Sequence, residues 1–156
     1  MSLRVGTGVD AHAFEDGVPL VLGGVGFESP RGLAGHSDGD VITHALIDAV
    51  LGAAGLGDIG SLFPSDSSTP VGVSSLDLLR DAVARVRDAG YAVVNADCVL
   101  IGEEPRIAER RMEMTDALSS VVGAPVNVRA TTTDGLGFTG RREGLAAQAV
   151  ALVESS

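Results

Sequence analysis

The sequence predicts an α+β fold, a two-layer sandwich in which a mixed β-sheet carries helices on one face. The chain has 156 residues, which suits one domain, residues 1–156, with one core. Val-rich segments typical of strands are interspersed with segments of helical periodicity, in the order β-β-α-α-β-α-β before a final segment. Hydrophobic residues make up 45% of the chain but aromatic residues only 3%, so we expect a core of Val, Leu, Ile and Ala.

The first part of the chain predicts two strands and a loop. Residues 3–14 alternate loosely and begin with residue types that favour strands. Residues 18–22 predict a second, short strand, and the glycine pair at 23–24 turns the chain. Residues 28–39 hold Pro, Gly, Ser and Asp, which favour a loop.

A helix is predicted next, at residues 40–52, where apolar residues recur at spacings of three and four. The segment 57–60, with two glycines, interrupts this pattern. Residues 64–74 are rich in Pro, Ser and Asp, and the stretch is short enough to be a mobile active-site loop rather than a domain boundary. The apolar stripe of the helix consists of Ile42, Ala45, Leu46, Ala49, Val50 and Ala53.

The second half predicts two further helices and two strands. A capping signature beginning at Ser74 opens a helix that ends at Gly90. Residues 91–101 are rich in Val and predict a strand, and Pro105 predicts the first turn of a helix that runs to Gly123. Residues 126–133 predict a strand that ends in three threonines. The tail, residues 145–153, fits either an Ala-rich helix or a buried strand.

Composition excludes several function classes. The net charge is −10, which argues against nucleic acid and anionic membranes as partners. The single cysteine, Cys98, allows no internal disulfide and no thiolate zinc site. The first residues do not resemble a signal peptide, and no apolar run reaches membrane-spanning length. We therefore expect a cytoplasmic protein.

All three histidines lie in the first 44 residues, within two short acidic motifs. Asp10 and His12 stand two positions apart, so on a strand their side chains share one face. His44 is on the predicted helix, one turn from Asp40 and one turn from Asp48, and either carboxylate could hold its second ring nitrogen. Two histidines and one aspartate with an open fourth position are typical of a catalytic zinc site. Each motif taken alone also has a structural explanation without a metal. Asp10 and His12 could be surface residues of a strand, and His44 could be a helix histidine with ordinary hydrogen-bond partners.

Two residues of the loop before this helix are candidates for contact with a substrate. His36 and Ser37 precede the helix N-terminus, where a histidine and a hydroxyl suit an anionic substrate. The alternative is that Ser37 or Asp38 is the N-cap of the helix, and the sequence leaves both open.

Residues 130–141 form a second group of side chains and glycines that could bind a ligand. Three threonines at a strand end are followed by Asp134 and three glycines, which let a backbone approach a ligand closely. Hydroxyls, amides and a carboxylate suit phosphates held with a hard cation such as Mg2+. A β-rich strand followed by a glycine turn explains the same residues without a ligand.

These motifs together resemble the 2-C-methyl-D-erythritol 2,4-cyclodiphosphate synthase family. The resemblance covers nearly the whole chain, in order and with matching spacing. It implies a homotrimer of α+β subunits, with each active site between two neighbours, and it implies that the tail from about Leu145 is a strand. It is carried by Asp10-x-His12, by His36-Ser37-Asp38-Gly39-Asp40 with His44, by Gly57-Asp58-Ile59-Gly60 with Leu62-Phe63-Pro64, and by Ala130-Thr131-Thr132-Thr133 with Gly137-Phe138-Thr139-Gly140-Arg141.

The resemblance also implies roles for individual residues. Zinc would be held by Asp10, His12 and His44, and Mg2+ or Mn2+ by Asp134, while His36 and Thr132 would stabilise the transition state. The methylerythritol phosphate side of the substrate would meet Asp10, His12, His36, Ser37, Asp58, Ile59, Gly60, Phe63, Pro64, Ser65, Asp66 and Ser67. The other substrate-binding positions, mainly those of the cytidine pocket of the adjacent subunit, are Gly102, Pro105, Arg106, Ile107, Ala108, Ala130, Thr131, Thr132, Thr133, Asp134, Phe138 and Arg141.

Four positions depart from the family pattern: Asp134 replaces a usual Glu, Gly135 and Arg106 replace frequent Lys residues, and Ser65 stands where an acid is common.

The implied reaction is attack of the 2-phosphate of 4-diphosphocytidyl-2-C-methyl-D-erythritol 2-phosphate on its β-phosphate, which releases CMP and leaves the 2,4-cyclodiphosphate. Two alternatives remain open. One is a zinc phosphohydrolase using Asp38, Asp40 or Asp58 as a base, and the other is a trimeric binding protein with structural zinc.

Overall fold

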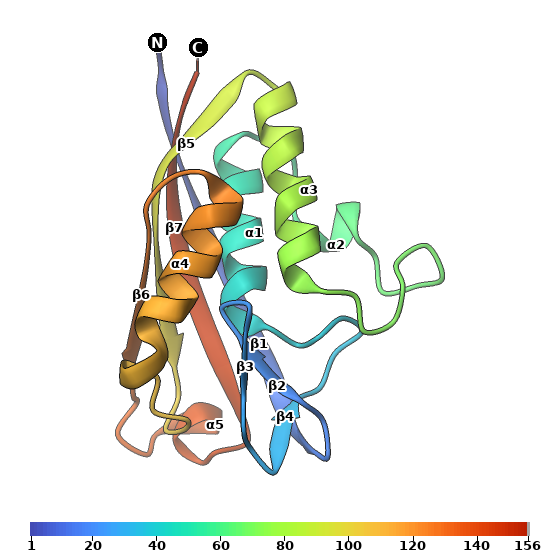
Figure 1. The fold of residues 1–156 in the computed structure, drawn as a ribbon, viewed down its shortest axis with the longest axis vertical. Coiled ribbons are helices and arrows are strands. Elements are labelled where there is room, and N and C mark those ends of the chain that lie inside the picture. The colour runs from blue at the N-terminus through green and yellow to red at the C-terminus, as the bar shows by residue number, and fades with distance from the viewer. Residues whose placement is uncertain (156) are drawn as a thin grey trace.

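A computed structural model describes residues 1–155 and is built around one five-stranded sheet (Figure 1). The strand order is β4-β1-β7-β5-β6. The pairing of β5 with β6 is parallel and the other pairings are antiparallel, so the predicted mixed sheet is confirmed. The strands span Arg31–Leu33 (β4), Leu3–Asp16 (β1), Gly144–Ser155 (β7), Tyr91–Ile101 (β5) and Val126–Thr131 (β6).

The helices pack on one face of this sheet, which confirms the predicted two-layer α+β class (Figure 1). Helix α1 lies against the central strands β1 and β7, α3 packs on α1, and α4 covers β6. The helices span Val41–Ala53 (α1), Ile59–Leu62 (α2), Ser75–Asp88 (α3), Arg111–Val122 (α4) and Gly137–Gly140 (α5), and a 3-10 turn, η1, covers Ala108–Arg110.

The other face of the sheet carries exposed apolar side chains. On β1 the odd-numbered residues point away from the helices, because the alternate residues Gly6 and Gly8 face α1. Val5 and Val9 are each 66% exposed. Val150 of β7 shares this face, since it pairs directly with Thr7, and it is 40% exposed. The exposed apolar residues therefore form a patch across neighbouring strands.

Two short strands form a hairpin beside the main sheet. β2 (Leu20–Leu22) pairs with β3 (Val25–Phe27), and Gly23 and Gly24 both have positive φ in the turn between them. This confirms the predicted turn. The expected loop at 28–39 was partly wrong, because residues 31–33 form β4, which pairs with the end of β1.

The apolar stripe predicted for the helix at 40–52 was too narrow. In α1, Asp48 and the exposed Gly52 are the only residues that are not buried. The reason is position: the sheet covers one side of α1 and α3 covers another. A helix enclosed in this way buries residues all round, which includes His44 and Thr43.

Two glycines bring α1 unusually close to β1. A Cβ added to Gly8 would lie 1.9 Å from the Ala45 carbonyl oxygen, and one added to Gly6 would lie 2.1 Å from the Ala49 carbonyl oxygen. Such distances are far inside van der Waals contact, so only glycine allows this approach. Because Ala45 adjoins His44, the same approach sets the position of the His44 ring relative to β1.

Several predicted element ends were wrong, each for an identifiable reason. Pro105 does not open a helix, because residues 102–107 form a loop that Gly102 ties to the Thr131 carbonyl, and α4 begins at Arg111. The strand predicted at 126–133 ends at Thr131, and residues 134–135 form a turn. The ambiguous tail is a strand, β7, since it pairs with β1 on one side and β5 on the other. Tertiary pairing here overrides the helix preference of alanine.

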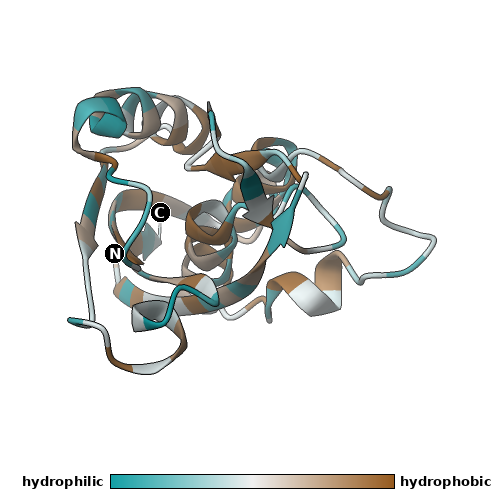
Figure 2. Cartoon of the chain, turned by 90° about the horizontal axis from the view of Figure 1, so that it is seen from below, coloured by the Kyte–Doolittle hydropathy of each residue, from teal (hydrophilic) through white to brown (hydrophobic). Residues whose placement is uncertain are grey.

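The two ends of the described chain lie side by side, as Leu3 pairs with Glu154 (Figures 1 and 2).

Cys98 is free and buried, and burial, with Asp97 and Asp40 nearby, raises the pKa of its thiol to about 12. Within residues 1–155, no helix combines the length and the apolar character needed to cross a bilayer.

Candidate metal centre and nucleotide cavity

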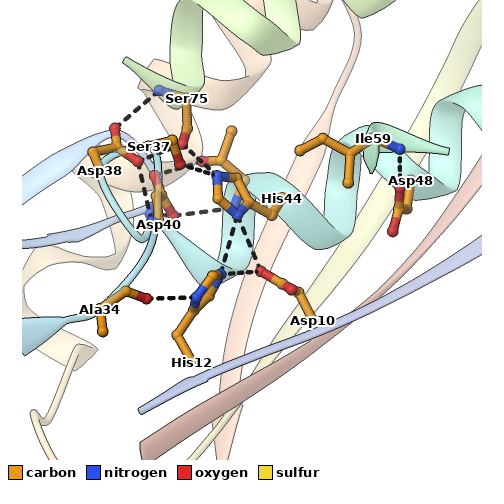
Figure 3. A network of polar contacts seen from close by, with 12 residues as sticks. Asp10, His12, Ala34, Ser37, Asp38, Asp40, His44, Asp48, Ile59 and Ser75 are labelled. Carbon is orange, nitrogen blue, oxygen red and sulfur yellow. Dashed lines mark hydrogen bonds and ion pairs between the residues drawn. The ribbon is translucent and has the colours of Figure 1, made fainter. Parts of the chain in front are cut away.

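Three side chains from two elements converge at one end of α1, as Figure 3 shows. Asp10 and His12 are on the α1-facing side of β1, and His44 is in the first turn of α1. Their facing atoms form a small triangle: Asp10 Oδ2 lies 2.8 Å from His12 Nε2 and 3.1 Å from His44 Nδ1, and the two nitrogens are 3.3 Å apart. The predicted ligand set is therefore brought together.

The triangle fits a tetrahedral metal ion. Zinc bound by nitrogen and carboxylate oxygen at about 2.0–2.2 Å places neighbouring ligand atoms roughly 3.3–3.6 Å apart. The observed edges reach that spacing if they open by a few tenths of an ångström. One carboxylate and two imidazoles are donors that zinc accepts, and three ligands leave the fourth position facing a cavity that all three residues line.

The outward nitrogen of each histidine has its own partner. His12 Nδ1 lies 2.7 Å from the Ala34 carbonyl oxygen, which can only accept, so Nδ1 carries a proton and Nε2 is the nitrogen that would bind a metal. His44 Nε2 lies 2.8 Å from both Ser37 Oγ and Ser75 Oγ. The prediction that Asp40 or Asp48 would hold this nitrogen was wrong.

Asp40 and Asp48 are engaged elsewhere. Asp40 is the N-cap of α1 and accepts bonds from the backbone N–H groups of Gly23, Gly24 and Thr43 and from the Thr43 hydroxyl. Burial raises the pKa of Asp40, while its Thr43 and Gly24 hydrogen bonds lower it. Asp48 accepts from the Ile59 N–H and so holds the start of α2. The N-cap of α1 is thus neither Ser37 nor Asp38.

Asp10 and His12 perturb each other electrostatically. Burial alone would raise the pKa of the Asp10 carboxyl, but the hydrogen bonds from His12 and His44 prevail and lower it to about 2. The hydrogen bond with Asp10 raises the pKa of His12, against the opposing effect of burial. Before a metal binds, the pair is therefore stabilised as carboxylate and imidazolium.

A cavity of about 200 Å³ opens beside the three ligands. His36 is held there from two sides, because its Nε2 lies 2.5 Å from the Thr69 carbonyl oxygen and its own carbonyl accepts from the Gly72 N–H. The sequence missed Thr69 and Leu78 as lining residues. The predicted residues that line this cavity are Asp10, His12, His36, Ser37, His44, Ile59, Gly60, Phe63 and Ser65.

Four residues predicted for the same region are not in this lining. Asp58 is the N-cap of α2, where it accepts from the Ser61 N–H. Asp66 accepts from the backbone and hydroxyl of Ser68 within the loop between α2 and α3. Pro64 and Ser67 belong to the same loop, which projects from the body of the molecule in Figure 1.

A second cavity, of about 470 Å³, lies at the carboxyl ends of β5 and β6, between the 102–108 loop and the end of β6. The predicted residues that line it are Gly102, Pro105, Arg106, Ile107, Ala108, Ala130, Thr131 and Thr132. Glu103, within the 102–108 segment that the resemblance assigns to the cytidine pocket, also lines it. The sequence missed Arg111 and Arg142, because both come from segments outside the recognised motifs.

The remaining predicted residues of this region are not in the lining of the cavity. Asp134, in a left-handed conformation with φ 53, exchanges hydrogen bonds with Thr132 Oγ1 at 3.3 Å. Thr133 donates to the Leu136 carbonyl, and Arg141 pairs with Glu143. Phe138 is 43% exposed. No cluster of potential metal ligands in residues 1–155 includes Asp134.

The charge of the second cavity is opposite to that of the chain. Arg106, Arg111 and Arg142 line it, and their guanidinium groups form no hydrogen bond or ion pair with residues 1–155. Glu103 also lines the cavity, but one of its oxygens accepts from the Gly135 N–H. Unpaired arginines gathered at one cavity of an acidic protein favour an anionic ligand.

A family model described as the YgbB family matches residues 3–154. The chain belongs to the YgbB family. The 2-C-methyl-D-erythritol 2,4-cyclodiphosphate synthase of Acidothermus cellulolyticus is 53% identical over 150 residues, which cover 96% of this chain and 93% of that protein. The alignment therefore covers nearly the whole length of both proteins.

Two solved structures share the fold of this chain. A 2C-methyl-D-erythritol-2,4-cyclodiphosphate synthase with CDP bound superposes with a TM-score of 0.87 at 38% identity, covering 97% of this chain and 100% of that one. The bifunctional IspDF of Campylobacter jejuni gives a TM-score of 0.95 at 37% identity over 99% of this chain. The match spans 43% of that longer protein.

Proposed function

We propose that this chain, as a 2-C-methyl-D-erythritol 2,4-cyclodiphosphate synthase, converts 4-diphosphocytidyl-2-C-methyl-D-erythritol 2-phosphate to the 2,4-cyclodiphosphate and CMP. An oxygen of the 2-phosphate attacks the β-phosphorus, and the bond from that phosphorus to the oxygen bridging it to the α-phosphorus breaks. The electron pair leaves with CMP, so no water enters. This reaction belongs to the non-mevalonate route to isoprenoid precursors. The observation that supports it best is the Asp10, His12 and His44 triangle opening onto a cavity in a chain of this family.

The proposed metal ligands follow from the donors present. Asp10 Oδ2, His12 Nε2 and His44 Nδ1 would hold Zn2+, and the Asp134 carboxylate would hold Mg2+ or Mn2+. When bound, these cations supply positive charge that neutralises the approaching phosphate groups and stabilises the transition state. An anionic nucleophile and a good leaving group remove the need for a general base or a nucleophilic side chain.

The chain's own residues would position the substrate. His36 and Ser37, at the edge of the first cavity, would contact the phosphate of the methylerythritol part, and Phe63 would cover its carbon skeleton. The second cavity would bind the cytidine diphosphate part, in keeping with the CDP in a related structure. Its unpaired arginines would contact phosphate oxygens, and Thr132 would donate a hydrogen bond to the reacting diphosphate.

We further propose a homotrimer in which each active site joins two subunits. The two groups expected to stabilise the transition state line different cavities of one chain, His36 the first and Thr132 the second. The open apolar face of the sheet, with Val5, Val9 and Val150, is the surface we assign to the contact between subunits. Association through this face would bring the second cavity of one subunit to the metal centre of its neighbour.

The phosphohydrolase alternative has less support, because the carboxylates considered as its base already have partners. Asp40 is completely buried as a helix cap, and Asp58 caps α2. Asp38 accepts from the Ser75 hydroxyl, the Ser75 N–H and the Asp40 N–H. None of the three lines the cavity next to the metal ligands.

Phosphorus NMR of the purified chain with zinc, magnesium and the diphosphocytidyl substrate tests this proposal. Cyclic diphosphate and CMP in equal amounts are expected. Inorganic phosphate in their place would support the hydrolase, and an unchanged spectrum with bound substrate would support a binding protein. The His12→Ala variant is the matched control for contaminating activity, since it removes one proposed ligand.

A further inference from the structure

A buried serine and a carboxylate stand behind the metal-binding histidine of α1 (Figure 3). Ser75, the first residue of α3, is fully buried, and its Oγ lies 2.8 Å from His44 Nε2. The same hydroxyl donates a short hydrogen bond to Asp38 Oδ1. Asp38 Oδ2 accepts from the Ser75 N–H at 2.9 Å, so residue 75 is held at two points by one carboxylate.

The direction of these bonds determines which nitrogen of His44 carries its proton. A hydroxyl has a single proton, and that of Ser75 points to the Asp38 carboxylate, which can only accept when ionised. The Ser75 oxygen is then an acceptor toward His44, so Nε2 must be the protonated nitrogen. Nδ1 faces Asp10 and His12, so a metal bound there would take the Nδ1 lone pair while Nε2 keeps its proton toward Ser75.

We propose that Ser75, oriented by Asp38, is a positioning residue that fixes His44 in the Nε2–H tautomer and thereby prepares Nδ1 to bind the metal. The proposal rests on the proposed function through the zinc site. Helix α3 would then support the metal centre as well as the core, because Ser75, its first residue, connects His44 to the loop that carries His36 and Ser37. His12 needs no such pair, since a backbone carbonyl already fixes its tautomer.

Ser37 alone does not replace this arrangement. Its hydroxyl also lies 2.8 Å from His44 Nε2, but no acceptor in residues 1–155 fixes the direction of its proton. Ser37 can therefore donate to Nε2 as readily as accept from it. Loss of Ser75 would leave both tautomers of His44 accessible.

The first test compares Ser75→Ala with Ser74→Ala. Ser74 is the exposed neighbour and forms no side-chain capping bond, so it is a matched control. Zinc affinity of the metal-free full chain would be measured by competition with a chromophoric chelator. Partners that orient a metal-binding histidine are typically worth 10–100-fold in affinity, so we expect a loss of about that size for Ser75→Ala and no change for Ser74→Ala.

The second test observes the tautomer itself. Nitrogen-15 NMR of the three ring-labelled histidines in the zinc-loaded wild type should show His44 protonated at Nε2 and bound through Nδ1. At the same zinc concentration, Ser75→Ala and Asp38→Asn should both add signal from His44 that is not bound through Nδ1, because the first removes the hydroxyl and the amide of the second cannot accept all three bonds that Asp38 now accepts. A zinc-loaded wild type in which His44 is not protonated at Nε2 would overturn the proposal without any variant.

The outcomes separate this inference from the proposed function. A wild-type chain that binds no zinc would refute the zinc site itself. A wild type that binds zinc, with a Ser75→Ala variant that is folded and binds zinc equally tightly, would refute only the role of Ser75. Should Ser75→Ala fail to fold, Asp38→Asn and the wild-type spectrum still decide.

Discussion

Replacing Gly8 by alanine should disrupt the metal centre from a distance. Gly8 is on β1, two residues before Asp10, and it contacts the backbone of α1 directly. The added Cβ would lie 1.9 Å from the Ala45 carbonyl oxygen and 2.9 Å from the Ala49 nitrogen. These are backbone atoms of a buried helix, so no side-chain rotation can relieve the contact.

The size of the disturbance follows from these distances. Real Cβ contacts are not shorter than 3.0 Å, so α1 and β1 must separate by at least 1.1 Å, the difference between 3.0 and 1.9 Å. Metal–ligand distances tolerate only about 0.2 Å, and the metal ligands stand on the two elements that separate. Overpacking of this kind typically costs about 1–3 kcal/mol of unfolding free energy. The free energy of zinc binding should therefore decrease by more than the free energy of unfolding.

Urea unfolding and a zinc competition assay measure the two effects. Gly52→Ala is the control, because Gly52 is an exposed residue of the same helix, and its added Cβ would meet only the Thr7 carbonyl oxygen, at 3.8 Å. That variant should be unchanged or more stable by up to about 1 kcal/mol. A Gly8→Ala chain with wild-type stability and wild-type zinc affinity would show that the close approach of helix and strand does not position the ligands.

Four further predictions follow from the two cavities and the metal ligands. Arg142→Gly should raise stability by about 1 kcal/mol, because residue 142 has φ 60, yet weaken CDP binding roughly 10–100-fold through loss of a charged contact; calorimetry showing undiminished CDP affinity would exclude a phosphate contact. Asp134→Asn should raise the Mg2+ concentration needed for half-maximal rate and leave zinc content unchanged, whereas an unaltered magnesium titration would leave Asp134 as a turn residue. In the metal-free chain, the Asp10 and His12 pair should stabilise the fold most between pH 3.8 and 6.5. This contribution is lost as pH falls through about 2, the pKa of Asp10, or rises through the raised pKa of His12; a pH series of urea unfolding with Asp10→Asn as reference checks both limits. Mixed trimers of His12→Ala and Thr132→Ala subunits should regain activity, and their complete inactivity, with mixing proven by mass spectrometry, would place each active site within one chain.

Local signals in the sequence were sufficient to predict the three side chains that converge as candidate metal ligands. Asp10 and His12 share a strand face through simple alternation, and the spacing of apolar residues placed His44 on a helix. The partner of the second His44 nitrogen could not be predicted in the same way. Helical spacing favoured Asp40 and Asp48, but Ser75 reaches His44 from another helix, and only tertiary packing brings the two together.

The same limit explains the errors in the fold. The final strand was ambiguous because alanines favour helix in isolation, while its pairing with β1 and β5 decides its conformation. Pro105 matched a common helix start, but the loop around it forms a cavity wall instead. Arg111 and Arg142 come from separate segments, so nothing in the linear pattern indicated that they share a cavity with Arg106.

The most direct test of the metal centre is anomalous diffraction at the zinc edge from crystals grown with zinc and CDP. One zinc peak per chain is expected, at about 2.0–2.2 Å from Asp10 Oδ2, His12 Nε2 and His44 Nδ1, with CDP density in the neighbouring subunit's cavity beside Arg106 and Thr132. A peak bound elsewhere, or coordination through Nε2 of His44, would contradict the arrangement proposed for this enzyme.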